Sequence, residues 1–233
     1  MVRLLALGLA ASACALQAPF RRDLRLETRR RSVAERTERP VLWTPDAASV
    51  EASAMKGFQR RVGVEGGYEE LWRWSVDHGD EFWSELMDFV GVEREGSLAP
   101  ARVGDVMPDV EYFPNVRLNF AENLLRHGKA GAALEGSEAI VSVSEARDTK
   151  RWTFGEAAAD AARVASALRA LGVDSGDACG AYVSNLGETV VAMLGATATG
   201  ATWTSCSPDF GARAVADRFG QVGPKVLFAS DGA

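Results

Sequence analysis

The segment that decides the fold runs from Ala178 to Ser230 and reads ACGAYVSNLGETVVAMLGATATGATWTSCSPDFGARAVADRFGQVGPKVLFAS. Its short apolar stretches ACGAYVS, ATWTS and KVLFAS are typical of buried strands, and the two stretches between them are typical of helices. We expect Asn185 to cap the first of these helices and Gly200 to end it. Strands that alternate with helices over short connections form a parallel sheet with right-handed crossovers. The segment therefore predicts an α/β layer structure.

Residues 137–172, directly upstream, predict a hairpin followed by a long helix. The stretches AIVSVS and KRWTF are strand-like and turn through Asp148, and Thr153 with Glu156 forms a capping box at the start of the helix. Gly172 ends the helix. Its expected inward face carries seven apolar residues at helical spacing, namely Phe154, Ala157, Ala161, Val164, Ala165, Leu168 and Leu171.

Residues 41–130 are rich in tryptophan and predict short amphipathic helices rather than strands. A break at residues 78–80 separates two of them, and Asp80 is a candidate cap for the second. The stretch RLNFAENLLRHG predicts a further helix that ends at Gly128. Two apolar stripes are expected to pack against a core rather than to form a ligand site, one made of Tyr68, Leu71 and Trp72 and the other of Phe82, Trp83, Leu86, Phe89 and Val90.

Residues 1–40 read as a leader and are left out of the expected fold. An apolar run from Leu4 to about Ala15 ends in small residues that fit a cleavage site, and it is too short to span a membrane. This is the layout of a secretory signal peptide. The Arg-rich stretch that follows indicates an organelle transit sequence, for a mitochondrion or a plastid, as the alternative; a two-part signal, and an unstructured segment of a cytoplasmic protein with no targeting role, also remain open.

The charge is unevenly distributed along the 233 residues. The formal net charge is −6, but residues 1–40 contain nine Arg and four acidic residues, so the other 193 residues carry a net charge of −11. An acidic body is unsuited to binding a nucleic-acid backbone. No nucleic-acid partner and no membrane partner is therefore expected.

Cysteine and histidine usage indicates neither a disulfide framework nor a metal centre. Of the three cysteines, Cys14 lies in the leader, and Cys179 with Cys206 on predicted buried strands reads as two free thiols, with a disulfide between them as the alternative. The two histidines, His78 and His127, are far apart and neither lies near a cysteine. No metal ligand is predicted.

The chain carries no complete catalytic motif. The patterns G-x-x-x-x-G-K-S/T, G-x-G-x-x-G, G-x-S-x-G and H-E-x-x-H do not occur, so no catalytic residue is predicted. One loop follows a predicted parallel strand at its carboxyl end, where α/β sheets bind ligands. Its Asp209 is expected to cap the helix that follows. The candidate binding residues are those of this loop, Ser207, Pro208, Asp209, Phe210 and Gly211.

Residues 152–210, from WTFGEAAADAARVASALRALGVDSGDACGAYVSNLGE to TVVAMLGATATGATWTSCSPDF, resemble the opening of the adenylate-forming acyl-CoA synthetase superfamily. The upstream stretches YEELWRWSVDHGDEFW and LNFAENLL resemble the N-terminal cap of acetyl-CoA synthetases. The stretches LWTPD, SAMKGF, LWRWSVDH and SPDFGARAVADRF together resemble, more narrowly, the acetoacetyl-CoA synthetase family. The resemblance covers residues 41–231.

This resemblance implies a helical N-terminal cap at residues 41–130, followed at residues 131–233 by the first part of a parallel-sheet AMP-binding domain. It implies an acetoacetate–CoA ligase, in which ATP adenylates the carboxylate of acetoacetate and the CoA thiol then displaces AMP. ATP, CoA and Mg²⁺ are the cofactors implied for the intact parent. Within the family the loop matching Ser207–Gly211 borders the CoA site and is rich in glycine, so only a CoA contact carries over to Ser-Pro-Asp.

The sequence departs from the family because the Ser/Thr/Gly-rich phosphate loop ending in Pro-Lys does not occur in it. We therefore expect the first third of a synthetase, inactive by itself, with the remainder as its partner. A truncated gene model, a fragment and a split product remain open. The alternative is a non-catalytic module that binds CoA or a partner chain. Acetate, propionate and longer 3-oxo acids remain open as acyl groups, with acetoacetate favoured.

Overall fold

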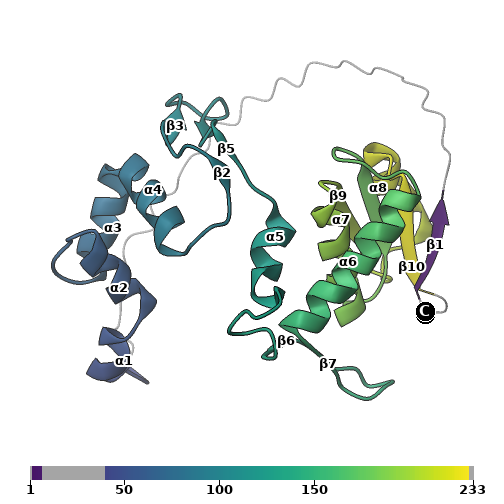
Figure 1. The fold of residues 1–233 in the computed structure, drawn as a ribbon, viewed down its shortest axis with the longest axis horizontal. Helices are drawn as coiled ribbons and strands as arrows, with labels where there is room; N and C mark the ends of the chain where they lie inside the picture. Colours follow the sequence, from purple (N-terminus) through teal and green to yellow (C-terminus); the bar gives the residue numbers. More distant parts are fainter. Residues whose placement is uncertain (1, 7–39, 231–233) are drawn as a thin grey trace. The chain divides into compact units, whose positions relative to one another are not determined.

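The computed structural model describes residues 2–6 and 40–230 and divides them into two compact units (Figure 1). Of the described residues, 40–89 form one unit, and 90–230 together with 2–6 form the other. Apart from residues 2–6 and 40, the predicted leader with Cys14 and its cleavage motifs lies outside the described residues. The boundary between the two units, after Phe89, falls within residues 41–130, which the sequence analysis assigned to a single helical cap.

The first unit is helical, as the sequence predicts, and centres on one phenylalanine. Phe58 is 4% exposed, and its ring meets those of Trp74, Phe82 and Phe89 edge to face at centroid distances of 6.4, 5.8 and 5.3 Å. Such aromatic contacts add about 0.5–1.5 kcal/mol per pair to the burial of apolar area. The helices are α1 (Ala47–Glu51), α2 (Ala54–Arg61), α3 (Tyr68–Asp77) and α4 (Gly79–Phe89).

The predicted inward stripe of α3 is wrong for two of its three residues. Leu71 is buried, but Tyr68 is 63% and Trp72 is 50% exposed. The reason is the rotation of the helix, which turns the row through Leu71 and Trp74 toward Phe58 and leaves the row through Tyr68 and Trp72 outside. The stripe of α4 is likewise only partly inward, because Trp83 and Val90 are exposed.

The predicted break between α3 and α4 is confirmed, but the predicted cap is not. Helix α3 ends at Asp77 and α4 begins at Gly79. The Phe82 N–H donates to the His78 carbonyl at 2.8 Å, so the hydrogen bonding of α4 already starts at His78. Asp80 therefore lies within the first turn, where its negative charge suits the helix dipole.

The second unit begins with short antiparallel pairs and a short helix. Strand β2 (Glu95–Gly96) pairs with β5 (Val116–Arg117), and β3 (Arg102–Val103) pairs with β4 (Glu111–Tyr112). Helix α5 (Phe120–Leu125) is capped by the Asn119 side chain and continues into a 3₁₀ turn, η1 (Arg126–Gly128). The predicted helix end at Gly128 is confirmed.

The predicted hairpin and long helix are confirmed. Strand β6 (Glu138–Ser142) pairs antiparallel with β7 (Lys150–Thr153). Helix α6 (Phe154–Ala170) starts at the predicted capping box, in which Thr153 Oγ1 accepts the Glu156 N–H at 3.1 Å and Glu156 accepts the Thr153 N–H at 2.8 Å. Leu171 is an exception to the predicted inward face, because it lies past the last turn and is exposed.

The α/β layer structure predicted from Ala178–Ser230 is also confirmed. Strands β8 (Ala178–Tyr182), β9 (Thr202–Cys206) and β10 (Val226–Ser230) are parallel, in the order β10-β8-β9. Strand β1 (Val2–Ala6) lies antiparallel on the outer edge of β10, which the sequence did not predict because residues 1–40 were set aside. It satisfies backbone groups that an open edge would leave unpaired.

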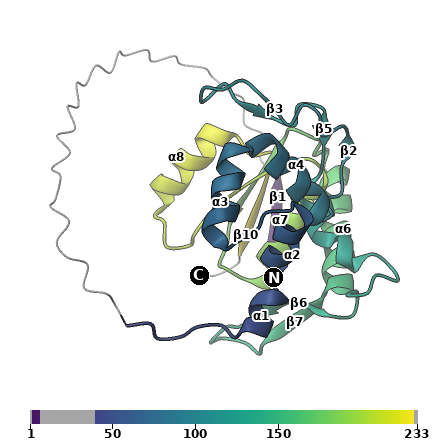
Figure 2. The same ribbon diagram turned by 90° about the vertical axis from the view of Figure 1, so that its left-hand side faces the viewer.

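The helices that connect the parallel strands lie on opposite faces of the sheet. Helix α7 (Gly187–Ala198) connects β8 to β9, and α8 (Ala212–Val222) leads from β9 past β8 to β10. Because the two connections run in opposite directions along the sheet, right-handed crossovers place their helices on different sides. Figure 2 shows α8 on one side of the sheet and α6 on the other.

The start of α7 differs from the sequence prediction. Its N-cap residue is Leu186 rather than Asn185, and the Leu186 side chain makes no capping hydrogen bond. Instead the hydroxyl of Ser142, at the end of β6, accepts the Gly187 N–H at 3.1 Å. The helix ends as predicted, because Gly200 follows the cap residue with a φ of +82° that favours glycine.

Helices α6 and α7 approach each other closely at Gly195. A Cβ atom on Gly195 would lie 2.5 Å from Val164 Cβ and 2.9 Å from the Ala161 carbonyl oxygen. Both distances are shorter than van der Waals contact, so a larger side chain would force the two helices apart.

The substitution Gly195→Ala is expected to destabilise the chain by about 1–3 kcal/mol, because overpacking a tight interface costs that much. Gly220→Ala is the matched control, since a Cβ atom on this helical glycine of α8 would meet nothing within 4 Å. It is expected to raise the free energy of unfolding by up to about 1 kcal/mol. Urea unfolding measures both. Equal changes in the free energy of unfolding of the two variants would contradict the close approach of α6 and α7 at Gly195.

Acid sensitivity is expected at Asp177, which lies before β8. Its carboxylate accepts the Asp174 N–H at 2.7 Å and binds Lys225 Nζ at 2.9 Å, and these contacts lower the pKa of Asp177 below its usual value of 3.8. A lowered folded-state pKa gives stability that is present above about pH 4 and is lost as the pH falls through the folded pKa. Asp177→Asn should therefore lose less stability than the wild type between pH 5 and 3 in urea titrations. If the free energies of unfolding of the two proteins fell by the same amount over this pH range, the expectation would be contradicted.

Candidate functional site

The predicted binding loop, Ser207–Gly211, lies where the sequence placed it. It leaves the carboxyl end of β9 and leads into α8, beside the carboxyl end of the neighbouring parallel strand β8. Open α/β sheets bind their ligands at this edge, because the loops there vary without disturbing the strands. The five candidate residues are therefore brought together by one turn.

Short-range hydrogen bonds hold the turn itself. The Phe210 N–H donates to the Ser207 carbonyl at 3.1 Å, and the Ser207 hydroxyl donates to the Asp209 carboxylate at 2.9 Å. The Asp209 N–H donates to Ser207 Oγ at 3.3 Å. The prediction that Asp209 caps α8 is therefore wrong, because its carboxylate is engaged with Ser207. Gly211 is the N-cap residue of α8, and no side chain caps it.

A tyrosine that the sequence analysis did not single out ties the loop to β8. The Tyr182 hydroxyl lies 2.9 Å from the Pro208 carbonyl oxygen and 3.1 Å from that of Phe210. One hydroxyl proton can be shared between two carbonyl acceptors in this arrangement. Tyr182 is the last residue of β8 and pairs with Cys206 of β9, so the loop starts beside its ring. The parallel pairing expected between these two strands is the sequence feature that could have identified Tyr182 as a neighbour of the loop.

The aromatic residue of the loop is held over α8. Phe210 is 39% exposed, and the Arg218 guanidinium lies 4.8 Å from the centre of its ring. Cation–π contacts of this kind contribute about 0.5–1 kcal/mol at exposed sites. A hollow of about 420 Å³ between α8 and the sheet is lined mostly by apolar side chains, among them Tyr182, Val215, Phe219 and Leu227.

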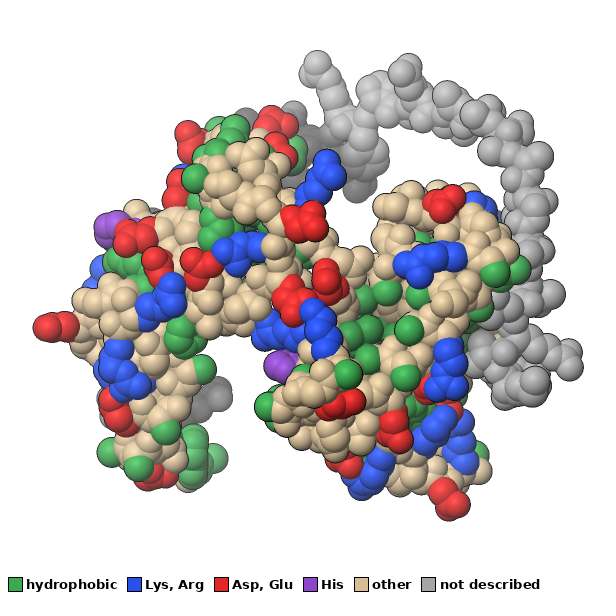
Figure 3. All heavy atoms as spheres, in the orientation of Figure 1, with side chains coloured by type: hydrophobic (Ala, Val, Ile, Leu, Met, Phe, Trp, Pro, Cys, Tyr) green, Lys and Arg blue, Asp and Glu red, His purple; other side chains and the backbone are tan. Residues whose placement is uncertain are grey.

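The other face of the sheet carries a second hollow, of about 360 Å³, between the hairpin, α6 and α7. Its floor is apolar, with Trp152, Val191 and Phe228 buried there. Figure 3 shows hydrophobic side chains gathered on this face over α6. The Trp152 indole donates to the Asp160 carboxylate at 3.0 Å, which satisfies the polar atom of the buried ring.

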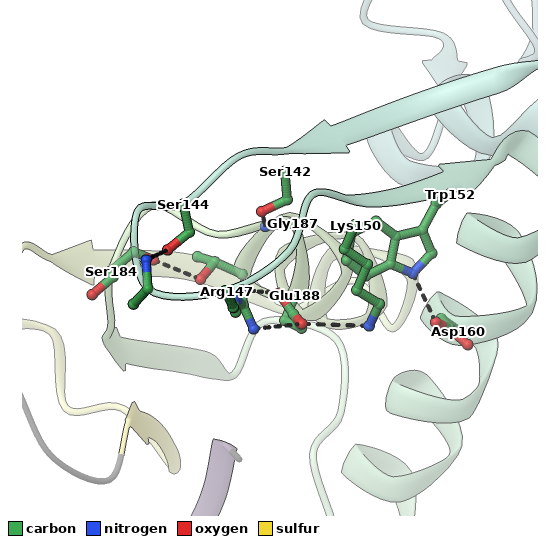
Figure 4. Close-up of polar contacts among 11 residues, drawn as sticks. Ser142, Ser144, Arg147, Lys150, Trp152, Asp160, Ser184, Gly187 and Glu188 are labelled. Carbon is green, nitrogen blue, oxygen red and sulfur yellow. Dashed lines mark hydrogen bonds and ion pairs between the residues drawn. The ribbon is translucent and has the colours of Figure 1, made fainter.

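Charged groups at the rim of this second hollow are paired with one another (Figure 4). The Glu188 carboxylate, in the first turn of α7, binds Arg147 at 3.0 Å and Lys150 at 3.4 Å. Burial alone would raise the pKa of Glu188, but the hydrogen bond from Arg147 and the two positive charges bring it below its usual value. The ionised Glu188 carboxylate joins the hairpin to α7 through these ion pairs, and it is not available as a general acid or base.

The cysteine prediction is confirmed within the described residues, where Cys179 and Cys206 are free and buried. Burial, together with the charge of Asp177, raises the pKa of the Cys179 thiol, so it stays protonated and is a poor nucleophile. Over the part of the chain that the structure describes, no cluster of three or more His, Cys, Asp or Glu could hold a metal ion, and no helix is long and apolar enough to cross a membrane.

Comparison with known proteins finds a family model that matches the C-terminal part of the chain and relatives that match most of it. A family model described as AMP-binding enzyme matches residues 129–233. Acetoacetyl-coenzyme A synthetase of Rhizobium meliloti (strain 1021) is 40% identical over 200 residues, which cover 84% of this chain and 30% of the relative. Acetoacetyl-CoA synthetase of Macaca fascicularis is 39% identical over 203 residues, which cover 81% of this chain and 28% of the relative. The chain therefore spans less than a third of the length of these relatives.

A solved structure supports the same assignment. Acetoacetyl-CoA synthetase from Streptomyces lividans matches with a TM-score of 0.74 at 38% identity, over 80% of this chain and 29% of that chain. This likeness supports the α/β fold that the sequence predicts. By sequence and by fold, the chain matches the N-terminal part of acetoacetyl-CoA synthetases, and its residues 129–233 match the AMP-binding enzyme family.

Proposed function

We propose that this chain supplies the N-terminal part of an acid–thiol ligase that activates acetoacetate with ATP and forms acetoacetyl-CoA. The observation that carries the proposal is 40% identity to an acetoacetyl-coenzyme A synthetase over 84% of this chain. Identity at this level over a continuous α/β layer supports a shared chemistry more strongly than a shared fold does, since one fold hosts many functions.

The proposed reaction has two steps with balanced charges. A carboxylate oxygen of acetoacetate attacks the α-phosphorus of ATP, and the acyl-adenylate forms as pyrophosphate leaves; a bound Mg²⁺ would supply positive charge to the leaving group. The CoA thiol then loses its proton to solvent and attacks the acyl carbon, so the C–S bond of the thioester forms as the bond from that carbon to the AMP oxygen breaks. The described residues of this chain contribute the first strands of the sheet and the loop at their carboxyl ends.

The loop Ser207–Gly211 is the proposed CoA contact of this chain. Its position at the carboxyl end of β9, the exposed ring of Phe210 and the apolar hollow between α8 and the sheet support a role in binding an elongated ligand. The loop contains no free base or nucleophile, because Ser207 and Asp209 bond to each other. A contact role, rather than a catalytic one, fits these observations.

Residues 1–233 are proposed to be inactive by themselves. The sequence contains no phosphate-binding loop of the Ser/Thr/Gly-rich type and no G-x-x-x-x-G-K-S/T motif, so nothing in it stabilises the charge that develops on transferring phosphate. The proposed partner is therefore the part of an acetoacetyl-CoA synthetase that the relatives carry beyond their match to this chain.

The purified 233-residue chain is expected to release no pyrophosphate from ATP in the presence of acetoacetate and Mg²⁺. A coupled pyrophosphate assay measures this, with the Streptomyces lividans acetoacetyl-CoA synthetase as the positive control. Acetoacetate-dependent pyrophosphate release by the chain alone would show that it does not need a partner.

A chimera tests the ligase itself. Residues 41–230 of this chain replace the matching residues of the Streptomyces lividans enzyme, and the chimera is expected to form acetoacetyl-CoA within about tenfold of the parent rate, because 38% identity preserves the layer architecture. Parallel assays with acetate and propionate show which of the three carboxylic acids the chimera converts fastest to its CoA thioester. A well-folded chimera that forms no acyl-CoA, while the 233-residue chain binds CoA by calorimetry, would favour a non-catalytic binding module.

A further inference from the structure

The chain that connects the two compact units is held by side chains from α5 and η1. We propose that Asn123 and Arg126 form a clamp on residues 90–93, so that the two units are joined by a hinge at Phe89 and Val90. The clamp is a conformational device of the fold, and the proposal does not depend on the ligase chemistry.

The first unit holds the chain up to the last residue of α4. Phe89 ends this helix, and the centre of its ring lies 5.3 Å from that of Phe58, which is 4% exposed. Two residues later Gly91 has a φ of +64°, a left-handed conformation that commonly follows a helix end and that favours glycine. The aromatic packing of the first unit therefore fixes the chain as far as Phe89.

The second unit binds the chain at the next residue. The Arg126 guanidinium donates to the Val90 carbonyl at 3.1 Å and also to the Gly91 carbonyl. Asn123 binds both backbone groups of Glu93, because its Nδ2 donates to the carbonyl at 2.9 Å and its Oδ1 accepts the N–H at 2.8 Å. Two side chains therefore hold four backbone groups of this short stretch.

Helix α5, which carries one arm of the clamp, is itself anchored in the α/β unit. Ala121 is completely buried and packs with Ala161 of α6 and Leu194 of α7. The Asn119 side chain caps α5 and also donates from Nδ2 to the Thr197 carbonyl at 2.9 Å. The clamped stretch is therefore tied through α5 to the helices that cover the sheet.

A third contact adds less to the clamp. Lys129 forms an ion pair with the Glu93 carboxylate, but the two side chains are 57% and 34% exposed. Water and salt weaken an ion pair that is this exposed. The Asn123 bonds are partly buried, and those of Arg126 come from a charged donor, so these two residues are expected to dominate.

The clamp sets the length of chain that joins the units. While it is closed, the chain passes from one unit to the other between Phe89 and Val90, and rotation about these two residues is the remaining freedom. If Arg126 releases its carbonyls while Asn123 keeps its hold, residues 90–92 are added to the joint. Three residues span up to about 10 Å when extended, so the reach of the joint grows by up to that amount.

Arg126→Gln removes the guanidinium, and Arg163→Gln is the matched control, because Arg163 of α6 pairs with Asp160 of the same helix. Hydrogen exchange of the 233-residue chain, read residue by residue by mass spectrometry with fragmentation, follows the Glu93 N–H. This N–H is bound by Asn123, so it responds to Arg126 only if the two side chains act together. Its exchange should be about fivefold to tenfold faster in Arg126→Gln and unchanged in the control.

Two further variants rank the contacts. Asn123→Leu removes both bonds to Glu93 and should accelerate exchange there at least as much as Arg126→Gln, whereas Lys129→Met should change it by less than about twofold. Unchanged exchange in β8 shows that the fold is intact. If Asn123→Leu does not fold, the Arg126 and Lys129 variants still decide the ranking.

Spin labels measure the hinge directly. Glu81→Cys on α4 and Ser166→Cys on α6 place one label on an exposed position of each unit, in a Cys14→Ser background. The distribution of distances between the labels, measured by double electron–electron resonance, should extend by up to about 10 Å at its far edge in Arg126→Gln. In the Arg163→Gln control it should match that of the parent.

Each readout can overturn a separate part of the inference. Unchanged exchange at Glu93 in Arg126→Gln overturns the joint action of the two side chains. Faster exchange with an unchanged distance distribution overturns the hinge. Equal effects of Arg126→Gln and Arg163→Gln overturn both, because the loss of any surface arginine would then produce them.

Discussion

The pairing of β8 with strands on both of its sides is the constraint on which the rest of the α/β unit depends. It sends the two crossovers in opposite directions and brings the loops that follow β8 and β9 to one edge of the sheet. Small residues make this central position possible. A Cβ on Gly180 would lie 3.1 Å from Pro224 Cγ and 3.3 Å from Leu227 Cδ1, so the strand lies in a space that leaves little room for larger side chains.

The two faces of the sheet have different chemical characters. On the α6 and α7 side, charged groups neutralise one another, and the Trp152 indole is satisfied by Asp160. On the α8 side, the loop presents an exposed aromatic ring, and an apolar hollow lies between α8 and the sheet. The first face therefore presents charges paired with one another at its rim, and the second presents apolar surface.

Much of the fold, and the place of the loop Ser207–Gly211 at the end of β9, could be predicted from the sequence, because strand-like and helix-like stretches alternate with clear turn residues between Thr153 and Ser230. Contacts between distant residues could not be predicted in this way. The Tyr182 hydroxyl reaches Pro208 only because β8 and β9 are in register, and Ser142 replaces Asn185 at the start of α7 because the hairpin lies there. Helical periodicity identified the inward side of α3 only in part, because the contact between the rings of Trp74 and Phe58 determines which side of the helix faces inward.

The bond from Ser142 to Gly187 also bears on the order in which this unit assembles. Helix α7 has no capping side chain of its own and receives its acceptor from a residue 45 positions earlier in the chain. During synthesis the hairpin emerges first, and its serine can meet the helix start as soon as α7 forms. The first turn of α7 is then consolidated by docking rather than by its own sequence, so hairpin and helix gain order as one cooperative unit.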